Sequence, residues 1–225
     1  MKIISRVLLT GFEPFGNFVK NSSYESIKTL HDKKINNAKI VVKSLPVSYN
    51  SAGKLLEHYI LESRPQIVIS FGMGTKFIQF EWIALNINYS TRKDNDGTII
   101  KKEETIKEDG PLAYKSRLPF RKIADTLKKH DIPFVQSFFA GTYLCNNIFY
   151  HLLYYAQKYQ ILLAGFIHLP PTPECFKNHP PIREKSNTTS KLRPTYSCIN
   201  YPTITLANLR RAIKLIVKTC IEFAL

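Results

Sequence analysis

The sequence predicts an α/β fold in which a parallel or mixed β-sheet is covered by helices on both faces. Short and almost continuously apolar segments, each the length of a buried strand, alternate with stretches that have the periodicity of amphipathic helices. The purest of these strands is 161–167, and a long helix follows Cys145. Such alternation is typical of sheets that bury both faces. Because α/β folds of 225 residues are commonly undivided, we expect one domain, 1–225.

The first half of the chain is expected to alternate strands with helices. The expected strands cover 3–9, 39–46, 66–72 and 77–89, and the expected helices cover 24–30 and 52–62. The opening residues superficially resemble a signal peptide, but Arg6 interrupts the apolar run and Gly11 soon follows it, so we interpret them as the first strand. Within 77–89, Glu81 shares one face with apolar side chains. A carboxylate in that position is either paired or takes part in chemistry.

The second half begins with a polar run, 89–108, which we interpret as an excursion or a hairpin. Further elements are then expected at 120–127 (helix), 133–139 (strand), from Cys145 onward (helix), 161–167 (strand) and after Pro202 (helix). Thr203 or Thr205 can cap that last helix. The segment 175–200 is rich in proline, serine, threonine and basic residues and lacks periodicity, so it is predicted to be a mobile loop.

Composition limits the classes of function. No apolar segment is long enough to span a bilayer, and 44% hydrophobic residues suffice for a core, so we expect a soluble protein. The formal charge of +15 could indicate a nucleic-acid or anionic-membrane partner. However, lysine and arginine are dispersed along the chain and no recognised nucleic-acid motif accompanies them. We therefore expect neither partner, while a non-catalytic basic binding protein remains an alternative.

The cysteines indicate a reducing environment and no metal centre. Cys145, Cys175, Cys198 and Cys220 have no metal-site spacing and are too sparse for a disulfide scaffold. Reduced thiols in the cytoplasm fit this pattern best.

Cys145 is the candidate nucleophile. The segment 137–146 runs an apolar strand into a small-residue turn and places Cys145 at the start of a helix. The free N–H groups and the positive dipole end of a helix favour thiolate over thiol. A lone cysteine at such a junction is more often structural. Here, however, His168 ends one strand and Glu81 lies on another, so the three side chains are expected to converge at one edge of the sheet.

Several separated segments add a family resemblance. They are 9–16, 81–97, 109–114, 140–146 and 165–170, and together with their surroundings they cover nearly the whole chain. In the same order, they resemble pyroglutamyl peptidase I, also called pyrrolidone-carboxylate peptidase, a family of cysteine peptidases that remove N-terminal pyroglutamate. The resemblance implies a single-domain, three-layer α/β/α sandwich with a mixed, mostly parallel sheet. It also implies no cofactor and, often, a homotetramer.

The resemblance assigns roles to the three converging residues. Cys145 would be the nucleophile that forms a thioester acyl-enzyme, His168 its base, and Glu81 the carboxylate that orients the imidazole. His168 would promote thiolate formation and later protonate the leaving amine. Backbone N–H groups around the Cys145 turn could receive the oxyanion.

The resemblance also assigns a pocket for the pyroglutamyl ring. Phe12 and Phe15 fall on the positions that sandwich the lactam, and the remaining pocket positions are Val47, Tyr143, Leu144 and Arg92. Arg92 stands where an apolar residue is frequent in the family, and the turn 72–76 is shorter than usual. Peptides with N-terminal pyroglutamate are the expected substrates, and the alternative is a triad-bearing relative with altered acyl specificity or weak activity.

Overall fold

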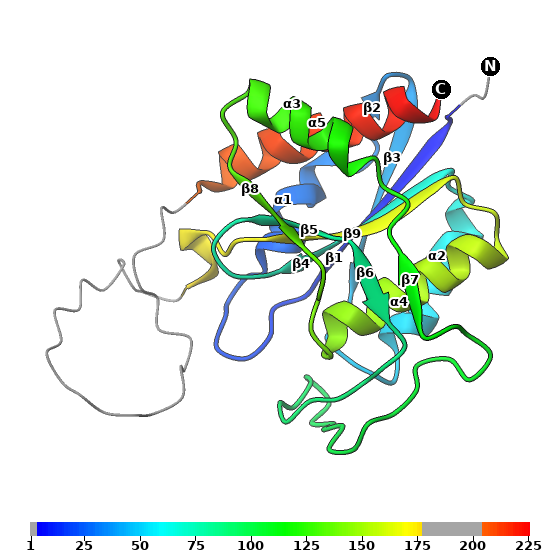
Figure 1. Ribbon diagram of the computed structural model, residues 1–225. Helices are drawn as coiled ribbons and strands as arrows, with labels where there is room; N and C mark the ends of the chain where they lie inside the picture. Colours follow the sequence, from blue (N-terminus) through cyan, green and yellow to red (C-terminus); the bar gives the residue numbers. More distant parts are fainter. Residues whose placement is uncertain (1–3, 177–203) are drawn as a thin grey trace, which may run out of the picture.

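A mixed, mostly parallel sheet forms the centre of the molecule, as the sequence predicts (Figure 1). The computed structural model describes residues 4–176 and 204–225, and the sheet has seven strands within them, in the order β2-β3-β1-β4-β9-β5-β8. The strands are β1 (Arg6–Phe12), β2 (Lys34–Ile35), β3 (Ala38–Leu45), β4 (Ile67–Met73), β5 (Ile78–Glu81), β8 (Phe134–Ser137) and β9 (Leu163–Leu169). Two neighbouring pairs are antiparallel, β2 with β3 and β5 with β9, and the others are parallel.

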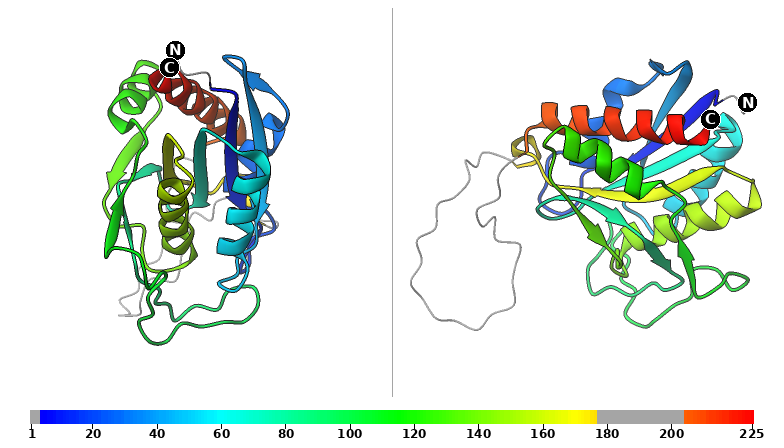
Figure 2. Two further views of the ribbon diagram at one scale, coloured as in Figure 1. Left: turned by 90° about the vertical axis from the view of Figure 1, so that its right-hand side faces the viewer. Right: turned by 45° about the horizontal axis from the view of Figure 1, so that its top comes forward.

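Helices cover both faces of this sheet (Figures 1 and 2). One face carries α1 (Ser22–Ile27), α3 (Phe120–Lys129) and α5 (Leu206–Ala224), and the other carries α2 (Ala52–Ser63) and α4 (Leu144–Lys158). Two short 3-10 turns, Lys28–Leu30 and Pro173–Cys175, complete the helical elements of the described residues. The expected three-layer α/β/α arrangement is therefore confirmed.

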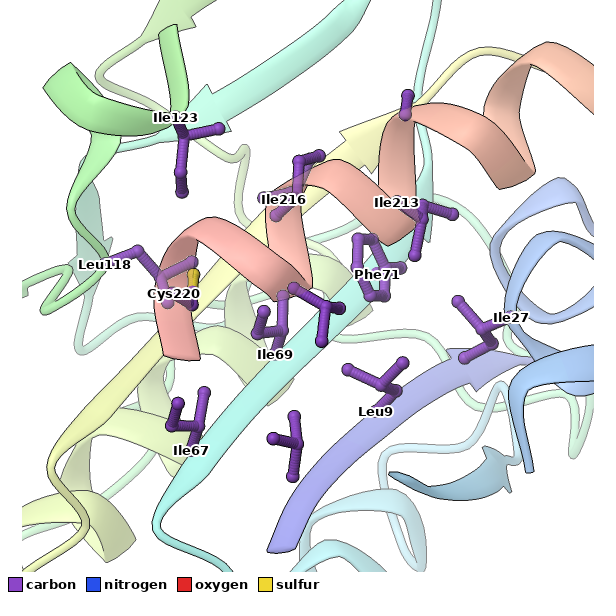
Figure 3. Close-up of a cluster of buried hydrophobic side chains, with 14 of the residues drawn as sticks. Leu9, Ile27, Ile67, Ile69, Phe71, Leu118, Ile123, Ile213, Ile216 and Cys220 are labelled. Atoms are coloured by element: carbon purple, nitrogen blue, oxygen red, sulfur yellow. The ribbon is translucent and has the colours of Figure 1, made fainter. Parts of the chain in front are cut away.

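Alternating side chains along the strands divide the core into two clusters. On β1, Val7 and Leu9 face the cluster under α3 and α5, whereas Leu8 faces the cluster under α2 and α4. Figure 3 shows the first cluster, with Leu9 and Ile69 below α5. Because both faces of the sheet are buried, the strands read as continuous apolar runs in the sequence. The buried apolar side chains of the inner strands β1, β4 and β9 consequently divide between the two clusters.

The prediction of one long strand over 77–89 is wrong. The sheet strand β5 ends at Glu81, and β6 (Ile83–Leu85) pairs instead with β7 (Ala113–Lys115) in a separate two-stranded sheet. The change occurs at Trp82, whose N–H donates to the carbonyl of Ser137 while its own carbonyl accepts from the N–H of Ser116, both at 2.8 Å. The backbone thus exchanges one neighbour for another without interrupting its extended conformation.

Other differences concern the ends of elements. The helix expected at 24–30 begins earlier, at Ser22, because Asn21 caps it by accepting the N–H of Ser23. The final helix is capped by Thr205, whose hydroxyl accepts from the N–H of Asn208 at 3.2 Å.

The loop predicted at 175–200 is contradicted at its start and lies mostly outside the described residues. Cys175 is fully buried in a 3-10 turn, and its carbonyl accepts from the N–H of Val19 at 3.1 Å. Thr203, the other cap candidate for α5, also lies outside the described residues. Among the helices of the described part, none is long and apolar enough to cross a membrane.

Candidate active site

Glu81 and His168 lie on the face of the sheet that α4 covers. On β9, Phe166 faces the cluster under α4, and His168 follows it by two residues. On β5, Phe80 faces the opposite cluster, so Glu81 points toward α4. The antiparallel register pairs Glu81 with Phe166 and Gln79 with His168, which makes Glu81 and His168 diagonal neighbours. Their side chains meet, with Nδ1 of His168 2.7 Å from Oε1 of Glu81.

The Glu81–His168 pair is buried. Glu81 is 1% exposed and His168 is 8% exposed, and the second carboxylate oxygen, Oε2, has no hydrogen-bond partner among the described residues. Burial alone would lower the pKa of His168, but its interactions with the neighbouring Cys145 and Glu81 side chains raise it to about 10. The pKa of this imidazole therefore lies above its usual range, and its protonated form is favoured at neutral pH.

Cys145 is the second residue of α4. The residue at the helix N-cap, Tyr143, makes no side-chain capping bond, so no cap competes for the first N–H groups of the helix. Cys145 is partly exposed, whereas Cys175 and Cys220 are fully buried, and Cys198 lies outside the described residues. Of the cysteines that the structure describes, only Cys145 combines solvent access with a helix start and a histidine.

Two glycines of the turn 72–76, Gly72 and Gly74, allow the side chains of Cys145 and His168 to lie close to β4 and the turn that follows it. In the β4–β9 register Gly72 is the partner of His168. A Cβ atom at Gly72 would lie 2.9 Å from Sγ of Cys145, and one at Gly74 would lie 2.8 Å from Cβ of His168. Both distances are too short for a side chain to fit without a shift. Glycine at the end of a buried strand often marks the close approach of another group, and this pattern in the sequence could have identified the position.

Most of the predicted pocket residues lie in one apolar cluster with Cys145. Phe12, Val47 and Leu144 are buried in it, and Phe15 and Tyr143 pack against it while partly exposed. The cluster borders the nucleophile directly, since Leu144 and Tyr143 precede Cys145 in the chain. A flat and mostly apolar group could therefore be held beside the thiol.

Arg92 lies outside the buried part of this cluster. It is an exposed residue on the loop between β6 and β7, and its N–H donates to the hydroxyl of Ser90 at 3.0 Å. Burial and the charges of Asp94 and Cys145 raise the pKa of Tyr143 to about 12, and the charge of Arg92 acts in the opposite direction. Arg92 is thus close enough to Tyr143 to lower the pKa of its hydroxyl, from a position at the exposed edge of the cluster.

Asp94 connects the loop between β6 and β7 to the segment after β3. Its side chain is 6% exposed and accepts three backbone hydrogen bonds. Oδ1 accepts from Asp96 at 3.0 Å and from Thr98 at 2.7 Å, which closes the turn. Oδ2 accepts from the N–H of Tyr49 at 2.9 Å. The turn predicted only as part of an excursion therefore fixes the backbone next to Val47.

Asn95 connects the same turn to the loop that carries the two phenylalanines. Its N–H donates to the carbonyl of Val47 at 2.8 Å, and its side-chain amide donates to Oε1 of Glu13 and to the carbonyl of Pro14. The same oxygen of Glu13 accepts from the N–H of Val47 at 3.0 Å. Glu13 and Pro14 lie between Phe12 and Phe15 in the sequence, so this network fixes the backbone next to three of the predicted pocket residues, Phe12, Phe15 and Val47.

A second network holds Phe12 from the other side. The hydroxyl of Ser23 accepts from the N–H of Phe12 at 2.9 Å and donates to Oδ1 of Asn21 at 2.7 Å. The amide of Asn21 in turn donates to the carbonyl of Glu13 at 2.9 Å. The polar residues that cap α1 thus also fix the end of β1.

Comparisons with known proteins agree with this architecture. Residues 5–189 match the family model described as pyroglutamyl peptidase. A pyrrolidone-carboxylate peptidase of Bacillus mycoides is 33% identical over 219 residues, which cover 96% of this chain and 93% of that protein. The solved pyrrolidone carboxyl peptidase of Thermococcus litoralis is similar with a TM-score of 0.85 and 37% identity, covering 98% of this chain and 94% of that one.

A third relative supports the same conclusion. The solved pyroglutamyl peptidase I of Bacillus amyloliquefaciens has a TM-score of 0.83 and 29% identity, and 97% of each chain is covered. The family model spans far more than half of the sequence, and the relatives are matched over nearly their full lengths. This chain belongs to the pyroglutamyl peptidase family.

Proposed function

We propose that this chain is a cysteine peptidase that hydrolyses the bond after an N-terminal pyroglutamyl residue, with Cys145, His168 and Glu81 acting as a unit. The observation that carries the proposal is the position of the His168 imidazole. Its Nδ1 lies 2.7 Å from Oε1 of Glu81, and a Cβ atom at Gly72, the strand partner of His168, would lie 2.9 Å from Sγ of Cys145. Family membership and the names of the relatives support the choice of substrate.

The proposed reaction has two stages. In the first, the thiolate of Cys145 attacks the acyl carbon of the pyroglutamyl residue, and a tetrahedral intermediate forms. Its oxyanion is received by backbone N–H groups at the uncapped start of α4. Protonated His168 then gives its proton to the leaving amine, the C–N bond breaks, and a thioester to Cys145 remains.

In the second stage, neutral His168 takes a proton from water as the water oxygen attacks the thioester. Collapse of this second intermediate breaks the C–S bond, releases pyroglutamate and restores the pair of thiolate and imidazolium. Glu81 keeps the imidazole in one orientation and stabilises its positive charge throughout, because it is buried and its Oε1 lies at Nδ1. No step requires a metal ion or a cofactor.

The apolar pocket provides the proposed specificity. Phe12 and Phe15 would hold the two faces of the neutral lactam ring beside Leu144. A substrate with a free amino terminus would have to bury an ammonium group among apolar side chains, which is costly without a carboxylate partner. Arg92 at the rim would repel such a cation further.

The test is hydrolysis of matched chromogenic amides by the purified chain. We expect cleavage of pyroglutamyl amide, much weaker cleavage of prolyl and glutaminyl amides, and loss of turnover in Cys145→Ala. The matched control is Cys220→Ala, which removes a fully buried thiol on α5 and should leave KM and kcat unchanged where the chain folds. Equal cleavage of prolyl and pyroglutamyl amides would instead support a relative with altered acyl specificity, and full activity in Cys145→Ala would reject the cysteine mechanism.

We also propose that residues 1–225 act as one catalytic domain and that the chain assembles into a homo-oligomer, a tetramer by resemblance to the family. Sedimentation velocity of the purified chain measures the assembly directly, and a single species with the mass of one chain would reject it.

A further inference from the structure

The hydroxyl of Tyr49 is a buried polar group without a partner. Its oxygen is buried and makes no hydrogen bond within the part of the chain that the structure describes. The residue is not loosely held, because its N–H donates to Oδ2 of Asp94 at 2.9 Å and its ring packs edge-on against Tyr143, with centroids 5.7 Å apart. Buried polar groups in native proteins are nearly always hydrogen-bonded, so an exception requires an explanation.

The ring of Tyr49 lies among the side chains that are predicted to bind the pyroglutamyl ring. Tyr143 is two residues before Cys145, and the ring of Tyr49 packs against the same apolar cluster as Phe12 and Val47. Burial and then the charges of Tyr143, Asp94 and Cys145 raise the pKa of Tyr49 well above its usual range. The group therefore stays protonated and is a hydrogen-bond donor without an acceptor among the described residues, on a side chain that packs against the same cluster as Cys145.

The proposed substrate contains the matching group. A pyroglutamyl ring is flat and largely apolar, but its lactam carbonyl must leave water when the ring enters the pocket. The side chains of Phe12, Phe15, Val47 and Leu144 offer no hydrogen-bond donor. The Tyr49 hydroxyl is a side-chain donor on the same cluster that has no acceptor among the described residues.

We propose that the Tyr49 hydroxyl donates a hydrogen bond to the lactam carbonyl oxygen of the pyroglutamyl ring and so distinguishes this ring from proline. The inference rests on the proposed function. Proline has a ring of similar size without the carbonyl, so its binding would leave the donor unpaired, and sites built to hydrogen-bond a substrate reject analogues that lack the bonding group.

The variant Tyr49→Phe tests this contact, because it removes the hydroxyl and keeps the ring against Tyr143. Two quantities are measured: the inhibition constant of 2-pyrrolidone, which is the lactam without the acyl group, and KM for a pyroglutamyl amide. We expect both to rise about tenfold, as for the loss of one hydrogen bond, with a smaller change in kcat. We also expect the urea midpoint to stay unchanged or to rise, because the variant removes an unpaired buried donor.

Tyr150→Phe is the matched control. Its hydroxyl donates to the carbonyl of Pro111 at 2.6 Å, so the control should lower the urea midpoint and leave the binding of 2-pyrrolidone unchanged. An unchanged inhibition constant in Tyr49→Phe would overturn the proposal, and so would a fall in kcat alone, which would indicate an oxyanion contact. A lowered urea midpoint with unchanged binding would indicate a merely structural hydroxyl.

A separate measurement distinguishes failure of this inference from failure of the proposed function. Protection of Cys145 from iodoacetamide by 2-pyrrolidone reports lactam binding without turnover. If the unsubstituted chain does not cleave pyroglutamyl amides, the proposed function fails, while a weaker protection in Tyr49→Phe would still support the contact. If the chain cleaves them and the variant is protected equally well, only the inference about Tyr49 fails.

Discussion

Replacement of Asp94 by asparagine is expected to loosen the pocket without changing any residue that touches substrate. The carboxylate accepts N–H bonds from Asp96 and Thr98 on one oxygen and from Tyr49 on the other. Asparagine has the same shape but only one acceptor oxygen. If that oxygen accepts from Asp96 and Thr98, the amide nitrogen of the asparagine faces the N–H of Tyr49, and that bond is lost. If the amide is turned the other way, the bonds from Asp96 and Thr98 are lost instead.

The orientation that loses only the bond from Tyr49 is the less costly one, so it determines the expected loss of stability. One hydrogen bond to a charged acceptor contributes about 1.5–3 kcal/mol, and a donor left buried without a partner adds to that cost. We therefore expect Asp94→Asn to lower the free energy of unfolding by about 3 kcal/mol. For a chain of this size, that corresponds to a fall in Tm of roughly 6–12 °C. Because the segment that carries Tyr49 loses its anchor, KM for a pyroglutamyl amide should rise as well.

Urea denaturation and Michaelis kinetics check both effects. The control is Asp109→Asn, since Asp109 is an exposed carboxylate that, among the described residues, accepts a hydrogen bond from the hydroxyl of Tyr154 alone. It should cost less than about 1 kcal/mol and leave KM unchanged. An Asp94→Asn variant with the stability and KM of the unsubstituted chain would refute the assignment of Asp94 as the anchor of this loop.

Three other perturbations have defined outcomes. Gly72→Ala should lower kcat/KM by about 100-fold, because the added Cβ would lie 2.7 Å from Cζ of Phe166 and 2.9 Å from Sγ of Cys145 and so displace the thiol. Unchanged kinetics would show that the added methyl group leaves the thiol in place. His168→Gln should slow iodoacetamide labelling of Cys145 near pH 7, and the two rates should converge above about pH 9, where an ordinary thiol is ionised anyway; identical profiles would make His168 structural. Burial, with the charge of Lys107, lowers the pKa of His151 to about 4, so this residue is neutral when folded and binds a proton more readily when unfolded. Its contribution to stability is therefore present above about pH 6.5 and is lost as the pH falls toward 4, by up to about 3 kcal/mol, and His151→Phe should flatten that part of the stability curve.

The layered fold could be predicted because both faces of the sheet are buried. Strands such as Ile67–Met73 and Leu163–Leu169 are mostly apolar and are buried along almost their whole length, and α4 and α5 carry one apolar face each. These patterns reflect the burial of each segment by itself, which the spacing of apolar residues in the sequence indicates. The split at Trp82 could not be predicted in this way, because both halves are extended and only the partner strand changes.

The candidate site was predictable to the same extent. Glu81 and His168 stand out because they are ionisable groups in apolar strands, and Cys145 because it begins a helix. The diagonal register that joins Glu81 to His168 depends on β5 pairing antiparallel with β9, which no local pattern specifies. The unpaired hydroxyl of Tyr49 is equally invisible, because a missing hydrogen bond is a property of the assembled neighbours rather than of the residue.

The acyl-enzyme itself can be observed. Purified chain is mixed with a pyroglutamyl ester, quenched in acid within one turnover, digested and analysed by mass spectrometry. If Cys145 is the nucleophile, the peptide that contains it gains one pyroglutamyl group, the gain disappears on treatment with hydroxylamine, and Cys145→Ala shows none. A chain that turns over the ester while the label appears on a different residue would contradict the proposed mechanism.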